Sequence, residues 1–273
     1  MVAAVRHLAI FAACYVAAQV VAAAVLAGVA VSWRAVLVAG LTGLGTYLVD
    51  RSRPFAGTPD PGDLRAEPER VRFMLAYQLP VRLLACAALA LALLLALPWG
   101  VYAALVPLSV VGLLCYSRWS AHGRRLKDVL WLKNPTVAVS ITAFALLLVY
   151  ATSTTQWSMF LLAGVVLLLR ITADAMRCDI DDAESDARQG TRTVANVLGV
   201  PAAWRLALLL DVAAAGAACA EAPHIGWLPA IAMGGIPLAA SGVLTMWKPR
   251  RSRDLVDAIG ALSVLVAWCV VAA

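Results

Sequence analysis

Long apolar runs alternate with short charged segments along the whole chain. A transmembrane helix needs about 20 mainly apolar residues to cross the hydrocarbon core of a bilayer. Runs of about this length predict an all-α polytopic membrane protein with nine transmembrane helices. The predicted spans lie approximately at 8–31, 35–50, 73–97, 99–117, 135–152, 157–178, 203–221, 226–247 and 255–273.

Prolines mark several of the boundaries between these spans. Pro98, together with Gly100, separates the third span from the fourth, and Pro135 lies in the first turn of the fifth. Pro223 separates the seventh span from the eighth, and Pro249 ends the eighth. Proline is tolerated in the first turn of a helix but breaks its interior, so these positions support the predicted limits.

The composition agrees with a membrane protein and leaves no room for a separate soluble domain. Of the 273 residues, 63% are hydrophobic and 14% are charged, whereas soluble domains carry about 25% charged residues. We therefore predict a single transmembrane domain over residues 1–273. The first run is too long for the core of a signal peptide, so it is expected to be a membrane helix. The six cysteines form no C-x-x-C pair and the three histidines are scattered, so neither a disulfide framework nor a histidine-ligated metal is expected.

Lysine and arginine occur almost entirely in alternate loops. They follow the second, fourth, sixth and eighth spans, whereas the loops on the other side carry Arg34 alone. Because cytoplasmic loops carry the excess of Lys and Arg, we predict a cytoplasmic N-terminus and an outside C-terminus in a bacterial-type cell membrane. The net charge of +6 then reflects topology and contact with the lipid bilayer, not nucleic-acid binding, and no obligate protein partner is indicated. The basic cluster from Lys248 to Arg253 is interpreted as an orientation signal and is given no site.

The most unusual stretch of the chain follows the sixth span, over residues 170–199. Asp179, Asp182 and Asp186 fall at i, i+3 and i+7, so a helix would place all three carboxylates on one face. Such a stack repels itself unless a cation lies against it, and Mg²⁺ prefers carboxylate oxygens that it shares with substrate phosphates. Arg188 and Arg192 follow at once and offer donors to a phosphate. The alternative interpretation is a solvated loop of mixed charge.

A second segment of acids and arginines follows the second span, on the same predicted face of the membrane. Its acidic members are Asp50, Asp60, Asp63, Glu67 and Glu69. Two facing acidic segments could hold two metal ions and a diphosphate between them. In the alternative, Asp50 forms an ion pair with Arg51 or Arg53, and the other acids belong to a solvated loop.

Two motifs give the chain a resemblance to a known family. The pattern D-I-x-D-x-x-x-D-x-x-x-G-x-x-T-x-x-x-x-L-G, from Asp179 to Gly199, resembles the second aspartate-rich motif of the UbiA superfamily of intramembrane prenyltransferases. The segment from Tyr116 to Pro135 resembles the region between the fourth and fifth helices of that family. The resemblance covers the whole chain. It implies nine helices around a central cavity that opens to lipid, with the active site at the cytoplasmic face.

The resemblance also implies roles for particular residues. Asp182 and Asp186 would be the main metal carboxylates of the second motif, and Asp179 would support them. Asp50 would be the catalytic and metal-binding carboxylate of the first motif. The substrate-binding residues implied in the second region are Lys127, Lys133 and Arg118 for the diphosphate, and Tyr116 and Asn134 for the pocket wall.

The first motif departs from the pattern of the family, which is N-x-x-x-D-x-x-x-D at the end of the second helix. Here Thr46 replaces the asparagine, Asp50 is kept, and Pro54 replaces the second aspartate. Losing a carboxylate and an amide should weaken one metal site. Arg51 and Arg53 are expected to bind phosphate directly instead, because guanidinium groups can replace part of the charge of an ion. Thr46 and Arg51 are therefore included among the substrate-binding residues.

The function that the resemblance implies is Mg²⁺-dependent transfer of a polyprenyl group from a prenyl diphosphate to a hydrophobic acceptor, such as an aromatic compound, a quinone precursor or a lipid. One alternative is a terpene cyclase on the same fold, although such a site needs aromatic side chains and only 7% of the residues are aromatic. Another alternative is a non-catalytic membrane protein that binds isoprenoids. A channel or transporter is disfavoured because the acids lie at one face and not at mid-membrane.

Several ionisable residues fall inside the predicted spans. Arg170 and Asp174 are one helical turn apart and are predicted to form an ion pair. Arg82 and Asp211 lie within the third and seventh spans. Residues of this kind are functional candidates by default, because burying a charge in a bilayer is costly.

Overall fold

The computed structural model describes residues 7–52, 68–118, 120–121, 124–125, 129–154, 157–188, 190–249 and 253–273. Helices account for nearly all of this, beside one antiparallel pair of two-residue strands. The elements of the first half are α2 (Ile10–Leu26), α3 (Trp33–Ser52), α5 (Pro68–Ala76), α6 (Gln78–Ala96), the 3₁₀ helix η1 (Leu97–Ala104), α7 (Leu105–Arg118), β1 (Ser120–Ala121), β2 (Arg124–Arg125) and α8 (Lys133–Thr152). Those of the second half are α9 (Met159–Arg188), α10 (Val194–Val197), α11 (Val200–Ala220), α12 (Ala222–Ile225), α13 (Trp227–Trp247) and α14 (Arg253–Ala272).

These helices confirm the prediction of an all-α polytopic membrane protein. Each predicted apolar run overlaps one long helix, from α2 through α14. Among the described residues, five stretches are long and apolar enough to cross a membrane: Gln78–Tyr116, Lys133–Thr152, Val200–Ala220, Trp227–Trp247 and Arg253–Ala272. Helix α2 is apolar but shorter, with 17 residues. The total of nine spans and the central cavity stay predictions.

The helix boundaries agree with the proline pattern. Pro98 lies in the first turn of η1, and Gly100 there has a φ of 62°, a backbone conformation that glycine adopts without strain. These two residues turn the chain between α6 and α7. Pro135 is in the first turn of α8, Pro223 lies in the short α12 between α11 and α13, and α13 ends at Trp247 just before Pro249.

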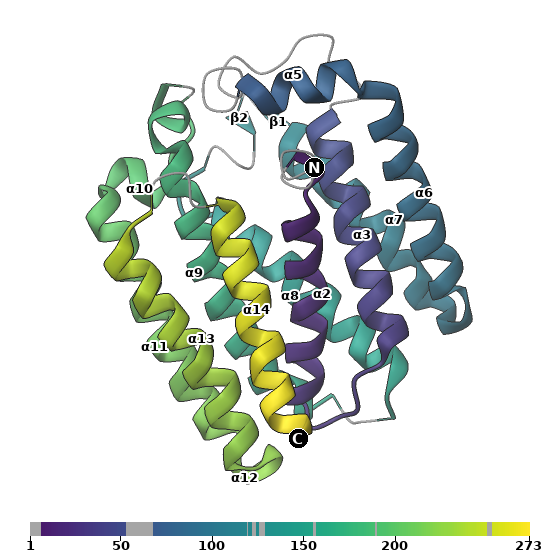
Figure 1. Ribbon diagram of the computed structural model, residues 1–273, viewed down its shortest axis with the longest axis vertical. Coiled ribbons are helices and arrows are strands. Elements are labelled where there is room, and N and C mark those ends of the chain that lie inside the picture. The colour runs from purple at the N-terminus through teal and green to yellow at the C-terminus, as the bar shows by residue number, and fades with distance from the viewer. Residues whose placement is uncertain are drawn as a thin grey trace.

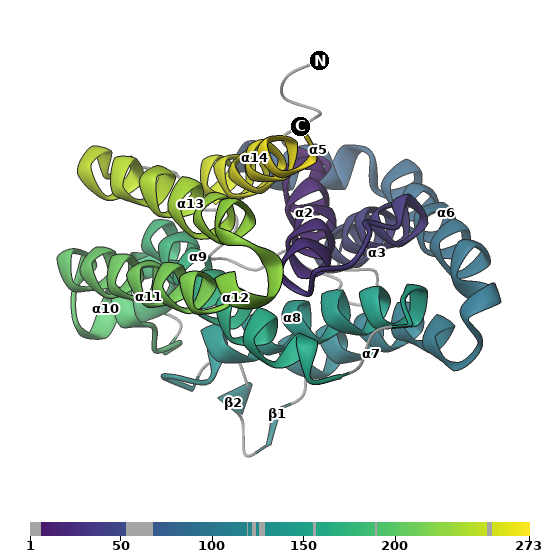
Figure 2. The same ribbon diagram turned by 90° about the horizontal axis from the view of Figure 1, so that it is seen from below.

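The long helices run side by side along the long axis of the molecule (Figure 1). Helix α2 lies among the others and contacts α3, α8, α9, α13 and α14 (Figure 2). Alanine and valine make up most of its buried surface, and small side chains let neighbouring backbones approach closely. Large apolar side chains such as Val101 and Met246 instead point outward and are 80% and 79% exposed, as expected of surfaces that face lipid.

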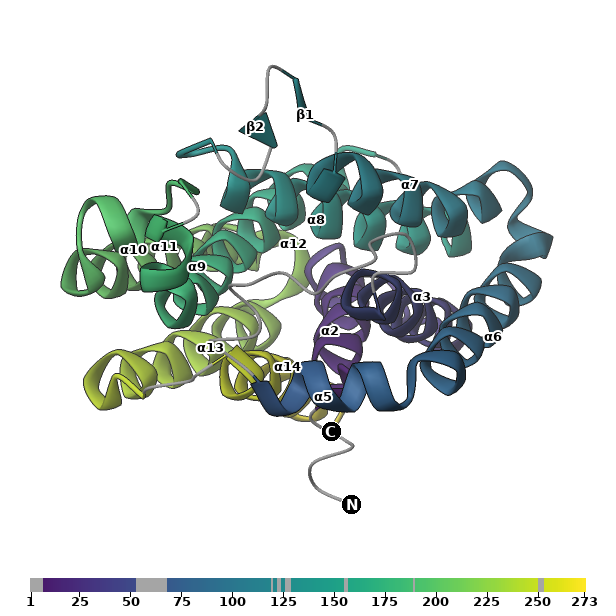
Figure 3. The same cartoon turned by 90° about the horizontal axis from the view of Figure 1, so that it is seen from above.

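One end of the bundle collects the charged connections. Helix α5, the β1–β2 hairpin, α10 and the first turn of α14 all lie at this end (Figures 1 and 3). The C-terminal end of α9 reaches it as well, because α9 has 30 residues and is therefore about 45 Å long, well beyond the hydrocarbon thickness. The described parts of the acidic and basic segments after the second, sixth and eighth spans thus lie at one end of the molecule.

A buried polar network ties the helices together below this end. Arg177 of α9 is 1% exposed and donates to Asp174 of the same helix at 3.0 Å and to Asp211 of α11 at 2.5 Å. Ser241 of α13 donates to the same Asp211 oxygen, and Tyr15 of α2 donates to Asp174 at 2.9 Å. The predicted pairing of Asp174 with Arg170 is therefore wrong, because the carboxylate bonds to Arg177 and Tyr15.

Candidate active site

The acidic stretch of the sequence forms the last turns of α9. The helix continues without a break to Arg188, so Asp179, Asp182 and Asp186 lie on one face of it, as their spacing predicts. Asp179 is buried, whereas Asp182 and Asp186 are half-buried. The alternative of a solvated loop is excluded by this helix.

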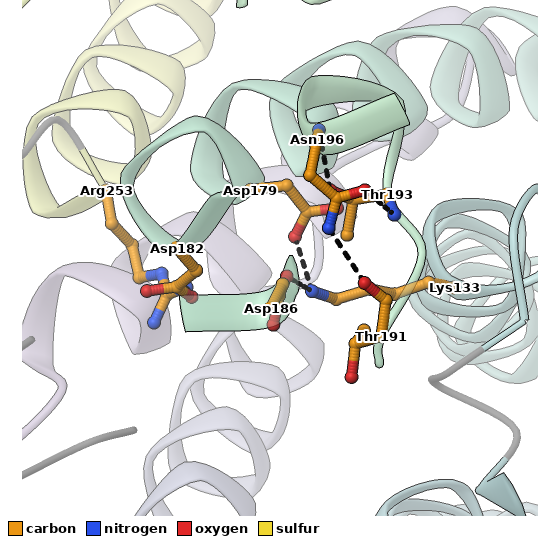
Figure 4. Close-up of polar contacts among 8 residues, drawn as sticks. All are labelled: Lys133, Asp179, Asp182, Asp186, Thr191, Thr193, Asn196 and Arg253. Carbon is orange, nitrogen blue, oxygen red and sulfur yellow. Dashed lines mark hydrogen bonds and ion pairs between the residues drawn. The ribbon is translucent and has the colours of Figure 1, made fainter. Parts of the chain in front are cut away.

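Lys133 joins two of these carboxylates. It is the first residue of α8, which packs along α9, and its Nζ lies 2.9 Å from Asp179 Oδ1 and 2.8 Å from Asp186 Oδ2 (Figure 4). The side chains of Lys133, Asp179 and Asp186 are only 17%, 7% and 14% exposed. These ion pairs are therefore largely shielded from solvent, where a charge-assisted hydrogen bond is strong.

Arg253 binds the third carboxylate from another helix. It is the first residue of α14, and its guanidinium donates to Asp182 Oδ2 (Figure 4). Its backbone N–H donates to Asp181 Oδ2 at 3.0 Å, so α14 begins directly on the acidic turns of α9. The basic cluster that contains Arg253 is predicted to be an orientation signal without a site, and in the structure Arg253 contacts the acidic turns of α9. The available signal was that its basic cluster and the acidic stretch are predicted on the same membrane face.

Two further residues of the second motif, Gly190 and Thr193, lie in the turn that follows the acidic face. Gly190 has a φ of 76°, which suits glycine, and Thr191 N–H then donates to Asp186 carbonyl oxygen at 2.9 Å. Thr193 and Asn196 form a reciprocal capping box at the start of α10. Asn196 also donates to the Thr191 carbonyl at 2.7 Å (Figure 4). This turn fixes the end of α9 and leads the chain into α11.

The electrostatics of the site distinguish its carboxylates. Asp179 and Asp182 lie beyond the apolar part of α9. Burial raises the pKa of Asp179 above its usual range, although Lys133 beside it acts in the opposite direction. Burial would raise the pKa of Asp182 too, but Arg253 and Lys133 outweigh it and the pKa is lowered. Asp182 is therefore ionised at neutral pH.

Other predicted residues approach this cluster from α3 and α7. Helix α3 contacts α7 and α8, and α8 contacts α9, so Asp50 of α3 and Tyr116 of α7 come from helices that pack around the helix pair that carries the cluster. Asn134, beside Lys133, is buried.

Two predicted residues of α3, Thr46 and Arg51, form hydrogen bonds outside the carboxylate cluster. The Thr46 and Ser109 hydroxyls are 3.4 Å apart, which joins α3 to α7. Arg51 donates to the His7 carbonyl at 3.4 Å. The remaining residues of these predictions, namely Arg53, Pro54, Asp60, Asp63, Glu67 and Lys127, lie outside the described residues, and Arg118 is the last residue of α7.

The donor chemistry of this cluster fits a hard divalent cation. Carboxylate oxygens are the ligands that Mg²⁺ prefers, and Asp179 Oδ2 is buried without a hydrogen-bond partner among the described residues. Within the same residues, no three His, Cys, Asp or Glu side chains are gathered closely enough to hold a metal ion. The reason is visible in the contacts, because Lys133 lies between Asp179 and Asp186 while Arg253 holds Asp182.

Comparison with known proteins gives a family and a fold for the chain. Residues 79–271 match the model of the UbiA prenyltransferase family. A solved structure described as digeranylgeranylglyceryl phosphate synthase in membranes superposes with a TM-score of 0.56 at 13% sequence identity. The match covers 98% of this chain and 100% of that chain, so the two share a fold along their whole length. Comparison with curated protein sequences gave no match.

Proposed function

This chain belongs to the UbiA prenyltransferase family, and we propose that it transfers a polyprenyl group from a prenyl diphosphate to a hydrophobic acceptor with the help of Mg²⁺. Family membership supports intramembrane prenyl transfer as the class of reaction. The acceptor classes that we propose are an aromatic compound, a quinone precursor or a lipid. We place the reaction at the cytoplasmic face, because the basic loops lie at the same end as the acidic turns of α9.

The observation that carries this proposal is the cluster of Lys133 with Asp179, Asp182 and Asp186 at the end of an apolar bundle. A prenyl diphosphate has a strongly anionic head and an apolar tail. The head requires cations, from the protein or from metal ions bound to carboxylates. The tail requires apolar surroundings such as those that the helices provide.

In the proposed reaction, the bond between C1 of the prenyl group and the diphosphate oxygen breaks. A bond forms between C1 and the acceptor, which loses a proton, and the diphosphate leaves with the bonding electrons. The ammonium of Lys133 would bind the departing oxygens, with the Tyr116 hydroxyl as a further donor. Mg²⁺, when bound, supplies positive charge to the same oxygens.

We assign the remaining predicted residues to the same site. Asp50, Asp179, Asp182 and Asp186 would hold Mg²⁺. Thr46, Arg51, Arg118, Lys127 and Asn134 would contact the substrate together with Lys133 and Tyr116. The apolar helices would exclude water, which would otherwise capture the reactive allylic group in place of the acceptor.

The proposal is tested by a turnover assay on the purified protein in detergent. Prenyl diphosphates of several chain lengths are offered with Mg²⁺, with and without a panel of acceptors, while diphosphate release is followed. The panel contains aromatic acids, quinone precursors and, because of the name of the structural neighbour, a prenylated glyceryl phosphate. We expect release that depends on both the metal and one of the acceptors, with a prenylated product.

Two other outcomes would contradict prenyl transfer. Release without any acceptor, together with a hydrocarbon or alcohol product, would identify a cyclase or a hydrolase. Binding of the prenyl diphosphate without release of diphosphate would identify an isoprenoid-binding protein that has lost prenyl transfer together with the intact first motif. A parallel reaction with excess chelator measures the dependence on metal in either case.

A further inference from the structure

Each of the three carboxylates on the acidic face already has a cation from the protein itself. Lys133 lies between Asp179 and Asp186, at 2.9 and 2.8 Å, and Arg253 binds Asp182. Two positive side chains thus neutralise most of the charge of three negative ones. This explains how α9 can carry a stack of like charges at helical spacing in a partly buried position.

Lys133 and Arg253 occupy carboxylate oxygens that a metal ion could otherwise bind. Mg²⁺ would use the carboxylate oxygens that now accept hydrogen bonds from Lys133 and Arg253. Asp179 Oδ2 is not among these oxygens, since it is buried and without a hydrogen-bond partner among the described residues. A metal ion can therefore bind first at Asp179, but it can take Asp182 Oδ2 and Asp186 Oδ2 as further ligands only after the cations turn away.

Arg253 is placed so that it can turn away without releasing its helix. Its backbone N–H keeps α14 attached to Asp181, while a different group, the guanidinium, binds Asp182. The Arg253 side chain is 29% exposed, so one side of it faces solvent. The guanidinium therefore lies at the acidic turns of α9, where the diphosphate would bind.

We propose that Arg253 is a diphosphate-positioning residue that serves as the counter-ion of Asp182 until Mg²⁺ takes its place. In the unliganded protein, Arg253 and Lys133 neutralise the acidic face. When the metal occupies the carboxylates, both cations turn to the diphosphate oxygens, which a guanidinium can bind in a bidentate manner. This inference rests on the proposed diphosphate site and adds a residue that neither aspartate-rich motif contains.

A consequence is that metal and diphosphate should bind cooperatively. A metal ion alone must displace Lys133 and Arg253 from these carboxylate oxygens, so it should bind weakly. A diphosphate gives these cations a new partner and should therefore strengthen metal binding. Coupling of this kind is reciprocal, so the metal should strengthen diphosphate binding by the same factor.

The test measures binding and not turnover. Mn²⁺ binding to the purified full-length protein in detergent is followed by electron paramagnetic resonance, with and without inorganic pyrophosphate. In Arg253→Gln we expect Mn²⁺ alone to bind about tenfold more tightly than in the wild type, and the enhancement by pyrophosphate to fall by about tenfold. Arg253→Lys keeps the positive charge but loses the paired N–H donors of the guanidinium. Mn²⁺ alone should therefore bind as in the wild type, while the enhancement of Mn²⁺ binding by pyrophosphate is reduced. Arg72→Gln removes an exposed arginine of α5 and should change neither quantity.

The outcomes separate this inference from the function on which it rests. If the wild type binds Mn²⁺ and pyrophosphate cooperatively but Arg253→Gln behaves as the wild type does, the role of Arg253 is disproved and the proposed function stands. If the wild type binds neither probe, both are disproved. A loss of Mn²⁺ binding in Arg253→Gln also contradicts the inference. The melting temperature of each variant is measured in parallel. If Arg253→Gln does not fold, the role of Arg253 is disproved when pyrophosphate strengthens Mn²⁺ binding to Arg253→Lys as much as it does in the wild type.

Discussion

At the scale of single residues, the site depends on carboxylates whose protonation and partners differ. Asp182 has a lowered pKa, since Arg253 and Lys133 outweigh its burial, and its partner Arg253 comes from another helix. Asp179 has a raised pKa because it is buried, and it shares Lys133 with Asp186. The aspartates of one motif are therefore not equivalent, although the sequence presents them as a simple repeat.

Asp182→Asn tests the proposed metal carboxylate with little change in shape. Removing its charge takes away a ligand oxygen that supports the developing charge on the diphosphate, so we expect turnover to fall by about 100-fold or more. Glu184→Gln is the matched control, because this side chain lies two residues away on α9 and is 82% exposed. The rate of diphosphate release is measured for both variants. A variant Asp182→Asn with full activity would remove Asp182 from the metal site.

At the scale of the elements, the sequence predicted local features well and distant partners poorly. The spacing of Asp179, Asp182 and Asp186 predicted one helical face, and α9 confirms it. The partner of Asp182 was missed because Arg253 lies 71 residues further along the chain, and periodicity within one segment carries no information on such a contact. The pairing of Asp174 with Arg170 was predicted from spacing alone. Tertiary packing instead brings Tyr15 to Asp174, and Arg177 turns toward Asp174 and Asp211.

The Arg177 network gives a prediction about how the helices are held together. Arg177→Met leaves Asp174 and Asp211 buried without their cation, and we expect this to destabilise the fold by about 3–5 kcal/mol. Adding Asp211→Asn removes one of the two uncompensated charges and should restore part of that loss. Thermal unfolding in detergent measures both changes, with Arg205→Met on the exposed side of α11 as the control. Equal stability of Arg177→Met and the wild type would show that the network contributes little.

At the scale of the whole molecule, the alternation of apolar runs and charged loops was the most informative part of the sequence. It predicted the helical membrane fold because a bilayer imposes one length and one hydrogen-bonding pattern on every span. The structure adds what this pattern cannot contain, namely which helices are neighbours. Lys133 of α8 meets Asp179 and Asp186 of α9 at the end that also carries α5, α10 and the start of α14.

The end of the molecule that carries the site should face the cytoplasm, and labelling can test this. The described parts of the basic segments after the second, sixth and eighth spans lie at this end, and cytoplasmic loops carry the excess of Lys and Arg. Arg72→Cys places a thiol on α5 at this end, whereas Thr154→Cys places one between α8 and α9 at the other. Both are made in a background without the six native cysteines.

A membrane-impermeant maleimide should then label Thr154→Cys in intact cells and Arg72→Cys only after the cells are broken. The two positions serve as controls for each other, because a leaky membrane would label both before lysis. The reverse pattern would place the acidic turns of α9 outside the cell and contradict the predicted orientation. Because the charge asymmetry and the site lie at the same end, this one measurement decides both the orientation of the helices and the side from which substrate enters.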